Sequence, residues 1–486
     1  MTSTLIILAL ATLFALGLGL VARSGHDMGL ESWTVGNRGF GAILVFLLMA
    51  GEIYTTFTFL GASGFAYGQG APAYYILAYG SIAYVMGYFL LPAIWQYGRD
   101  HHLVSQPDFF AHKYQSPSLG VLVTLVDIIA LIPYLVLQLT GLGIIVAVAG
   151  HGAIGKDTAI IIGAAVVTIY VIVSGIRGSA WTAVAKDIMI LAVVLFLGIY
   201  LPFHLYGGIG SMFDAIAKAK PGFLVFPAAG DSVWWFVSTV LLTALGFFMW
   251  PHTLASCYSA REAKTFRKNA IVLPLYQLIL LFVYFVGFAA VLQIPGLKGA
   301  ATNLALFKLV VAQFPPWFVG VVGAAGVLTA LVPGSMLTMT TATLISRNLY
   351  GAINPRASDD QIVFIAKCAV PVVMAIAVYF TITGSSTIVT LLLVGYSFVT
   401  QMFPSLLASL FPRLGVTREG AFAGIVVGVA LAAWLTFSHA SLGTLMPFLP
   451  AGIRDVNVGI IALIGNIVVL AGVSLATRGR QAIAAE

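Results

Sequence analysis

The sequence predicts an all-α polytopic membrane protein with about 13 transmembrane helices. Hydrophobic residues make up 60% of the 486 residues and charged residues only 8%, with a mean hydropathy of +1.04. Apolar stretches of about 20 residues, the length that spans a bilayer, recur along the chain. Lys and Arg fall unevenly between alternate loops, as they do in multi-pass proteins. A soluble domain is excluded, and the net charge of +7 does not indicate nucleic-acid binding, because the basic residues lie in short loops.

The helices are predicted in order from their apolar runs and from the Gly, Pro and charged residues between them. The first, 4–22, has no Lys or Arg before its apolar core, which argues against a cleaved signal peptide. The fourth and ninth helices are long enough to tilt or kink. The longest loop, 206–232, is expected to be a short extracellular excursion. The predicted helices are 4–22, 40–67, 72–97, 118–149, 158–174, 181–205, 233–257, 271–295, 313–349, 362–383, 387–411, 418–437 and 456–475.

The basic residues predict an N-terminus outside and a C-terminus inside. Lys186 lies within a span and belongs to neither side. The predicted inner loops and tail contain Arg23, Arg38, Arg99, Lys113, Arg177, Arg261, Lys264, Arg267, Lys268, Arg347, Arg356, Lys367, Arg413, Arg418, Arg478 and Arg480. The predicted outer loops contain Lys156, Lys218, Lys220, Lys298, Lys308 and Arg454. This bias supports the orientation and an odd number of helices.

The second predicted helix carries polar residues that a lipid-facing helix does not need. Glu52 lies near its middle, Gly51 precedes it, and several hydroxyl side chains follow. A carboxylate at mid-membrane is costly and usually marks an ion or substrate path. Glycines beside it let the helix open and offer backbone carbonyls to a ligand, as in the broken helices of secondary transporters. The alternative is a bent helix in which Glu52 is neutral and hydrogen-bonded.

Predicted helices two to six and seven to eleven share a layout that indicates an inverted five-helix repeat. Each unit opens with a breakable polar helix, the second of which contains Gly246, Pro251 and His252. An odd number of helices per unit inverts the second unit relative to the first. The predicted divisions are 1–39 (first helix and cytoplasmic loop), 40–205 (first repeat), 206–232 (extracellular loop), 233–411 (second, inverted repeat) and 412–486 (two peripheral helices and a short tail).

Five segments carry a resemblance to a known family. They are ESWTVGNRGFG, FLGASGFAYGQG, QPDFFAHKYQS, GFFMWPHTLASCYSAREAKTFRKNA, and FPPWFVGVVGAAG leading to ATLISRNLYG. In this order, from about residue 30 to 475, they resemble the sodium:solute symporter family, whose core is a LeuT-like inverted repeat. GEIYTTFTF, VAKDIMI, the Trp-Pro-His segment and TALVPGSM are most similar to the branch that carries short monocarboxylates such as lactate, pyruvate, acetate and propionate.

The resemblance implies a sodium site from which this chain departs. In the family, carbonyls of the broken second helix and two hydroxyls of the ninth helix hold Na⁺. Aligned on the closing RNLY segment, the hydroxyl positions fall on Val332 and Pro333, which have no side-chain oxygen. Na⁺ is a hard cation that needs oxygen ligands. The site is therefore incomplete unless Ser335 or Thr338 supplies an oxygen through a shifted register, and no metal site is predicted with Val332 and Pro333.

Lys186 and Asp187 stand where the family commonly has Thr-Asp, on a helix beside the sodium site in the shared fold. An ammonium there would take the place of the ion, as in related proton-driven transporters. A buried lysine can also lose and regain a proton. The hypothesis is that Lys186, with Glu52 or Asp187 as counter-charge and with the opened backbone at Gly51 and Tyr54, replaces Na⁺ by a proton-controlled switch. The alternative is that Lys186 reaches the cytoplasmic face and pairs with Asp187 structurally.

Polar and aromatic side chains at membrane depth are the candidates for substrate binding. Half-helix N–H groups, hydroxyls and amides are expected to bind a carboxylate, because no Arg lies mid-span. Gln138 could instead join helices, and His252 could be structural instead of carrying a proton. Ionised Glu52 would repel the anion and protonated Glu52 would not, which would couple proton to substrate. The candidates are Tyr54, Thr55, Thr56, Thr58, Gln138, Trp250, His252, Tyr396 and Gln401.

The predicted function is a secondary active symporter in the cell membrane that imports a small organic solute, best matched by a short monocarboxylate. Alternating access would be driven by H⁺, with Na⁺ as the alternative coupling ion. Competing predictions are a Na⁺-coupled symporter of another solute such as an amino acid, and more remotely a channel, a membrane-embedded enzyme or a solute sensor. No HExxH, GxSxG or P-loop motif indicates an enzyme.

The expected partners are the solute and the lipid bilayer, with no cofactor, nucleic acid or obligate protein partner. A solvated loop, not a metal site, is expected for His101, His102, His112 and Asp108.

Overall fold

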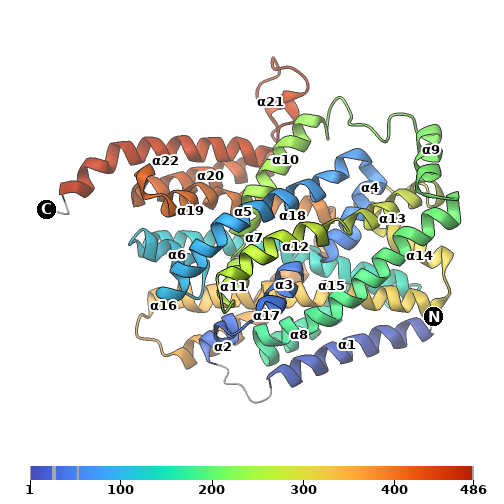
Figure 1. Cartoon of the computed structure of the whole chain (residues 1–486), viewed down its shortest axis with the longest axis horizontal. Coiled ribbons are helices and arrows are strands. Elements are labelled where there is room, and N and C mark those ends of the chain that lie inside the picture. Colours follow the sequence, from blue (N-terminus) through green and yellow to red (C-terminus); the bar gives the residue numbers. More distant parts are fainter. Residues whose placement is uncertain (1, 24–28, 52–53, 484–486) are drawn as a thin grey trace.

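The computed structural model describes residues 2–23, 29–51 and 54–483, with side chains for 2–21, 29–51 and 54–478. These residues form a bundle of helices joined by short loops, with an isolated backbone bridge between Phe40 and Ala260. Helix α1 (Thr2–Arg23) and helix α22 (Val458–Ile483) lie along opposite edges of the bundle (Figure 1).

Within the described residues, ten helical stretches are long and apolar enough to cross a membrane, or eleven if a bent pair counts as one span. Besides α1 and α22, they are α5 (Tyr75–Asp100), α7 (Pro117–Ala149), α8 (Lys156–Tyr206), α12–α13 (Lys264–Gln277, Leu280–Gln293), α15 with η6 and α16 (Pro316–Thr343, Leu344–Tyr350, Gly351–Ile353), α17 (Asp359–Thr383), α18–α19 (Ile388–Val399, Phe403–Leu410) and α20 (Arg418–Phe437). Helix α15 is buried along nearly its whole length and forms the centre of the bundle.

The second predicted helix is divided. It contains α3 (Ala42–Gly51), the π-helical η2 (Phe57–Ala62) and α4 (Ser63–Gln69). Residues 52–53, and with them the predicted site residue Glu52, lie outside the described residues. Among the described residues, Tyr54 and Thr55 lie outside any helix, between the end of α3 and the start of η2, so the described part agrees with an interrupted helix.

The seventh predicted helix, 233–257, is bent where it was predicted to be breakable. Helix α10 (Val233–Gly246) and helix α11 (Pro251–Tyr258) meet at 47°. Trp250 between them is extended, with φ −74° and ψ 129°. The ring of Pro251 disfavours helical backbone at the preceding residue and removes a backbone N–H donor, which accounts for the position of the bend.

Helix α8 joins two predicted helices, 158–174 and 181–205, into one stretch. A loop of six residues was expected between them, but the break is confined to Gly175, with φ 57° and ψ −160°. A Cβ atom on this glycine would lie 2.7 Å from the Trp33 side chain. A glycine alone is thus enough to turn the chain, because it adopts a conformation closed to other residues.

Shorter helices fill the connections. Helix α9 (Ile209–Ala219) lies within the segment 206–232 that was predicted as a loop. Its apolar side chains Met212 and Ile216 are buried, so tertiary packing stabilises a helix that its length alone would not. The other short helices include α2 (Leu30–Val35), α6 (Gln106–Lys113), α14 (Ala305–Gln313) and α21 (Leu442–Leu445).

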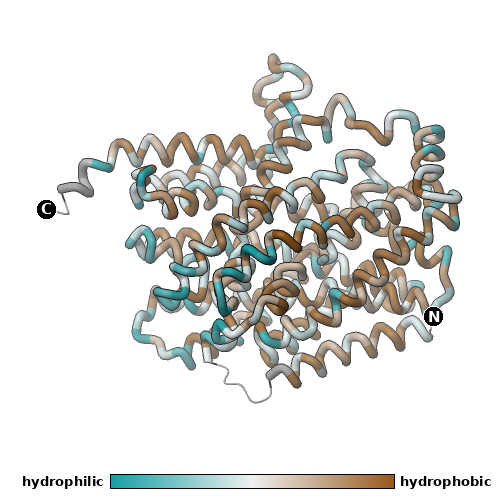
Figure 2. The backbone as a smooth tube through the Cα atoms, viewed as in Figure 1, coloured by the Kyte–Doolittle hydropathy of each residue, from teal (hydrophilic) through white to brown (hydrophobic). Residues whose placement is uncertain are grey.

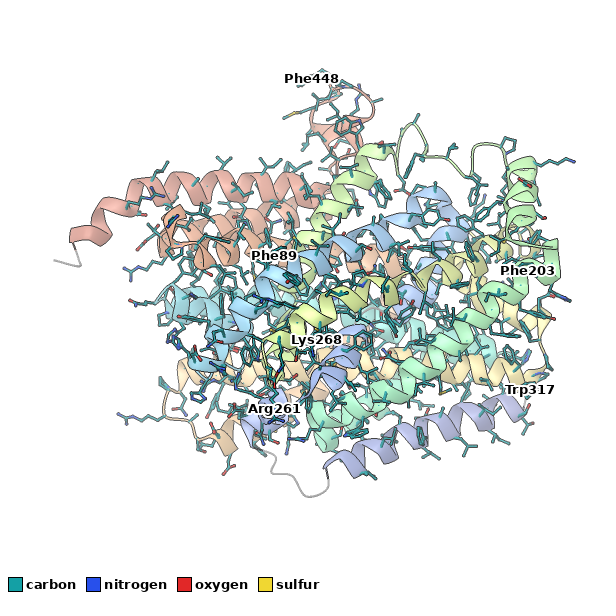
Figure 3. The ribbon with its side chains drawn as sticks, viewed as in Figure 1. Phe89, Phe203, Arg261, Lys268, Trp317 and Phe448 are labelled. Atoms are coloured by element: carbon teal, nitrogen blue, oxygen red, sulfur yellow. The ribbon has the colours of Figure 1, made fainter. Side chains whose placement is uncertain are left out.

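Hydrophobic residues predominate along the helices, and hydrophilic residues gather mainly in the loops and at the helix ends (Figure 2). Phe89, Phe203 and Trp317 are 72%, 57% and 57% exposed, as expected of side chains that face lipid. Arg261 and Lys268 lie toward the end of the bundle opposite to Phe203 and Trp317 (Figure 3). This distribution is typical of a multi-pass membrane protein.

Candidate coupling and substrate site

Lys186 is completely buried in α8, and its ammonium is held by the broken second helix. Its Nζ donates hydrogen bonds to the carbonyls of Gly51 and Tyr54 at 3.0 and 3.1 Å. Gly51 ends α3, and the N–H of Thr55 that a continuous helix would supply to it bonds the Oγ1 of Thr58 instead. The break therefore leaves carbonyl oxygens free to bind a cation, and the ammonium binds them.

Asp187 completes the surroundings of the ammonium. Its Oδ1 lies 3.0 Å from the Nζ of Lys186, and both side chains are buried. The alternative role agrees with the structure in part: Lys186 does pair with Asp187, but its side chain is 0% exposed and does not reach the cytoplasmic face. A Cβ atom on Gly51 would lie 3.2 Å from the same Nζ, so the ammonium leaves no spare room there.

The two positions that would carry sodium-binding hydroxyls have none. Val332 and Pro333 are both buried in α15. The Oγ of Ser335 lies within hydrogen-bonding distance of the Val332 carbonyl (2.7 Å) and of the Ser179 Oγ (2.8 Å). The hydroxyl of Thr338 donates to a carbonyl one turn earlier in α15 at 2.7 Å. Both hydroxyls donate their protons to backbone carbonyls of α15 and keep oxygen lone pairs that can bind a cation.

Tyr276 of α12 adjoins the coupling centre, although it was not predicted as a site residue. Its ring meets the Tyr54 ring edge-on at 5.0 Å, and its carbonyl accepts a hydrogen bond from the Tyr54 hydroxyl at 3.4 Å. Its own hydroxyl is buried and lies within hydrogen-bonding reach of the Asp187 carboxylate. The signal was present in the sequence, since Tyr276 and Gln277 are polar residues in an apolar run.

Thr56 and Gln138 link the broken helix to α7. The hydroxyl of Thr56 donates to the Gln138 Oε1 at 2.7 Å. The Nε2 of Gln138 has no partner within the described part of the chain, although the side chain is buried. Gln138 thus joins two helices, as its alternative role predicted, and keeps two N–H donors available for a ligand.

An aromatic cluster lies at the bend of the seventh helix. The Trp250 ring is 4.9 Å from Tyr134, 5.4 Å from Tyr396 and 5.9 Å from His252, measured between centroids. The Nδ1 of buried His252 has no partner in the described regions. The structure therefore brings together three predicted site residues, Trp250, His252 and Tyr396, and adds Tyr134.

Other predicted substrate residues have different positions. Thr55 and Thr58 bond the local backbone, with the Thr58 hydroxyl donating to the Thr55 carbonyl at 3.1 Å, so they stabilise the break itself. Gln401 is buried with its amide bonded to α18 and α22, and its role in substrate binding stays a prediction. Its Nε2 donates to the carbonyls of Ser397 and Gly459, and its oxygens accept from Asn466 of α22. The amide of Gln401 is therefore used in packing the peripheral helices.

A cavity of about 410 Å³ lies at one end of the bundle, near α4 and α10. Its lining includes Asp231, Trp235 and Lys298. Burial, together with the negative charge of Asp455, raises the pKa of Asp231 to about 6. This cavity is polar enough to hold water and charged solutes.

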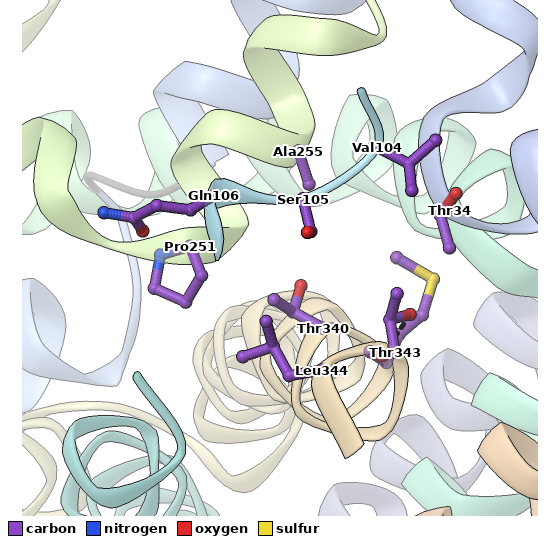
Figure 4. Close-up of a pocket in the computed structure, with 10 residues that line it drawn as sticks. Thr34, Val104, Ser105, Gln106, Pro251, Ala255, Thr340, Thr343 and Leu344 are labelled. Carbon is purple, nitrogen blue, oxygen red and sulfur yellow. Dashed lines mark hydrogen bonds between the residues drawn. The ribbon is translucent and has the colours of Figure 1, made fainter. Parts of the chain in front are cut away.

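The opposite end is closed around Ser105. There a space of only about 10 Å³ lies between α6, α11 and α15. Ser105 and Thr340 direct their hydroxyls toward one another across this space (Figure 4). The space around Ser105 is therefore too small for a solute, while a separate cavity of about 300 Å³, lined by Pro107, Asp108 and Arg347 among others, lies at the same end.

A cation held by a broken helix, beside a polar and aromatic cluster within membrane-spanning helices, is typical of a secondary transporter. The chain matches the sodium:solute symporter family over residues 33–428 and belongs to that family. It is thus a multi-pass integral membrane protein, and its family consists of transporters of small solutes.

Individual relatives agree with this assignment. The chain is 59% identical to an "uncharacterized symporter YhjB" of Bacillus subtilis (strain 168), over 100% of this chain and 99% of the relative. It is 31% identical to a "monocarboxylate transport permease protein" of Rhizobium johnstonii, over 90% of this chain and 89% of the relative. A solved structure of a Na⁺-coupled sialic acid symporter covers 98% of this chain and 97% of its own, with a TM-score of 0.81 and 16% identity. The fold is therefore LeuT-like, as expected.

Proposed function

We propose that this protein imports a short monocarboxylate across the cell membrane by proton symport and alternating access. The observation that carries the proposal is the buried ammonium of Lys186 on the carbonyls of Gly51 and Tyr54. In its protonated form it provides a positive charge at the carbonyl oxygens that a coupling cation would need as ligands. The absence of side-chain oxygens at Val332 and Pro333 agrees with the loss of Na⁺.

Protonation of Lys186 is the coupling step in this mechanism. The charged ammonium makes charge-assisted hydrogen bonds that tie the end of α3 to α8. A neutral amine would release this charge attraction, and the carbonyls would then separate from α8. Proton binding and release would thus alternate the contact between the broken helix and the rest of the bundle.

The substrate centre suits a small carboxylate with an apolar end. The free Nε2 of Gln138 and the ring of His252 offer donors, and Trp250 with Tyr134 forms an apolar wall. One relative is described as a monocarboxylate permease, which supports this class of solute. Na⁺-coupled transport of another solute, such as an amino acid, is the competing assignment.

The topology that we propose has thirteen spans, with the N-terminus outside and the C-terminus inside. In it, α8 forms two spans divided at Gly175, while α3, η2 and α4 together form one span, as do α10 and α11. The inverted repeats are 40–205 and 233–411, flanked by 1–39, 206–232 and 412–486. The cavity beside Asp231 then opens outward, and the closed space beside Ser105 faces inward.

The test is uptake of labelled lactate and pyruvate into liposomes that contain the purified protein. An inward proton gradient without Na⁺ is expected to drive accumulation, and an inward Na⁺ gradient at equal pH is not. Lys186→Met should abolish accumulation, whereas Lys308→Met, which changes an exposed lysine of α14, should not. Accumulation driven by Na⁺ alone would overturn the proton mechanism in favour of the Na⁺-coupled alternative.

Glu52 provides a separate prediction. It directly follows Gly51 in the sequence, and its charge would repel a carboxylate substrate unless it is protonated. Glu52→Gln, which imitates the protonated acid, is expected to abolish proton-driven accumulation and to retain lactate exchange between equal concentrations. Equal loss of both activities in the liposome assay would contradict a coupling role.

A further inference from the structure

Asp127 is a buried acid in α7 that the mechanism above does not use. Its side chain is 0% exposed, and neither carboxyl oxygen has a hydrogen-bond partner among the residues that the structure describes. An ionised carboxylate without a partner is strongly disfavoured in an apolar interior. In this conformation the side chain is therefore the neutral acid and carries a proton.

The position of Asp127 on α7 connects it with the substrate centre. Residues 124, 127, 131, 134 and 138 follow the 3- and 4-residue spacing of one helix face. Tyr134 on this face contacts Trp250 and His252, and Gln138 bonds Thr56. The carboxyl of Asp127 is on the same side of the helix, about 10 Å along the axis from Tyr134.

The same face continues to the closed end of the bundle. Gly120, about 10 Å from Asp127 in the other direction, packs against Ala111 and Pro107 of α6. Helix α6 also lines the closed space that contains Ser105. Asp127 therefore lies midway between the aromatic cluster and the closed end.

No described charged group neutralises Asp127. Helices α15 and α18, which pack on α7, have no charged side chain, and α18 contributes the titratable Tyr396. On α8, Lys186 pairs with Asp187 and bonds two backbone carbonyls of the broken helix. On α20, Arg418 pairs with Glu419, and Asp108 of α6 accepts a hydrogen bond from Asn348. The remaining charged groups on the helices around α7 are Lys156, Asp157, Arg177 and His204 of α8 and His112, Lys113, Arg347, Lys308, Asp359, Asp360 and Lys367 of α6, η6, α14 and α17. None of them bonds the Asp127 carboxyl in the described structure.

We propose that Asp127 is a second proton-binding site of the transport cycle, separate from Lys186. The inference rests on the proposed proton symport. While the α6 end is closed, the Asp127 carboxyl keeps its proton. When the α6 end opens, water reaches the carboxyl, the proton leaves to the inner solution, and the carboxylate remains until it is protonated again from the substrate centre.

The test combines infrared spectroscopy with accumulation measurements on the full protein. Wild-type protein at neutral pH should give the carbonyl band of a buried protonated acid, and Asp127→Asn should lack that band. In liposomes with a proton gradient of about one pH unit, each coupled proton contributes a factor of about ten to the limiting lactate ratio. Asp127→Asn is therefore expected to reach a ratio about tenfold lower while it retains exchange. Thr124→Val, one turn away on the same face, should match wild type.

The outcomes separate this inference from the proposed function. Absence of proton-driven lactate accumulation in wild type would contradict both the proposed symport and the second proton-binding site. An unchanged accumulation ratio in Asp127→Asn would overturn the second site alone, and so would absence of the acid band from wild type. If Asp127→Asn fails to fold, Asp127→Glu provides the test. This variant should keep the wild-type lactate accumulation ratio, and its infrared carbonyl band should be shifted. An unshifted carbonyl band would show that the band does not come from Asp127.

Discussion

At the scale of single residues, Lys186 and Asp187 form the one ion pair among the described residues in which both side chains are buried. Removing one partner of a buried pair typically costs about 3–5 kcal/mol, because the other charge is left uncompensated. Lys186→Met is therefore expected to lower the free energy of unfolding by about this amount.

The double variant Lys186→Met/Asp187→Asn leaves no unpaired charge and should recover most of that loss. Thermal unfolding of the detergent-solubilised variants measures both effects. The double variant should nevertheless fail to accumulate substrate under a proton gradient. A single variant as stable as wild type would mean that Asp187 is neutral in the folded protein.

Asp231 predicts a pH dependence of stability. Its pKa is about 6 in the folded protein, against 3.8 for an unperturbed aspartate, so between these values the folded state keeps a proton that the unfolded state loses. Its contribution to stability is fully present below pH 3.8 and is lost as the pH rises through about 6. The total is at most about 3 kcal/mol, at 1.36 kcal/mol per pKa unit, and solvent screening reduces it.

Melting temperatures measured from pH 4 to 7 test whether the stability of the folded protein falls as the pH rises. Wild type should lose stability between about pH 4 and pH 6 relative to Asp231→Asn. Asp455→Asn, which removes the neighbouring negative charge, should move the transition to lower pH. A wild-type curve parallel to that of Asp231→Asn would show that this carboxyl has the same pKa folded and unfolded.

The sequence predicted the residues of the site unevenly. Lys186 and Gln138 were found because a charge or an amide in an apolar run is unusual, and the structure places both at buried contacts with the broken helix. Asp127 is likewise a charged residue in an apolar run. Gln401 satisfies the rule as well, yet its amide serves the packing of α22. Pattern alone cannot say which helix a buried polar group faces, because that depends on tertiary packing.

At the scale of elements, Gly175 determines how α8 turns. Its φ of 57° with ψ −160° is a conformation that other residues rarely adopt, and a Cβ atom would collide with Trp33. Gly175→Ala is expected to lower the free energy of unfolding by about 1–3 kcal/mol. Gly472→Ala in α22, where a Cβ would meet nothing within 4 Å, is the matched control and should be neutral or slightly stabilising.

Thermal unfolding of the Gly175→Ala and Gly472→Ala variants tests whether the break in α8 requires glycine at position 175. A Gly175→Ala protein with unchanged melting temperature would mean that α8 can continue without its break. Since Gly175 separates two of the proposed spans, the variant should also show weaker uptake, because the second part of α8 carries Lys186.

Elements defined by apolar length were predicted better than elements defined by tertiary contacts. The prediction 418–437 coincides with α20, and 118–149 differs from α7 by one residue. The break of α8 was overestimated because SGIRGSA has the composition of a loop, whereas a single glycine suffices. Helix α9 was missed because its 11 residues are stabilised by packing and not by a membrane-length apolar run.

At the scale of the whole molecule, the distribution of basic residues and the positions of the cavities bear on the orientation of the protein in the membrane. The basic residues of the 261–268 segment lie at the closed end, and the large cavity lies at the other. Basic loops favour the cytoplasmic side. The proposed orientation therefore makes the cavity beside Asp231 open toward the outside, while the cavity beside Asp108 faces the cytoplasm.

The orientation is tested by labelling single cysteines with a membrane-impermeant maleimide. Cys257 and Cys368 are first replaced by Ala and Ser, and then either Lys298→Cys or Lys264→Cys is introduced. Both lysines are exposed, and the Lys264–Glu262 ion pair at the surface contributes little to stability. Lys298→Cys should react in intact cells, and Lys264→Cys should react only after the membrane is permeabilised. The reverse labelling pattern would place the N-terminus inside. The cavity beside Asp231 would then open to the cytoplasm, and the proposed orientation of the import cycle would be wrong.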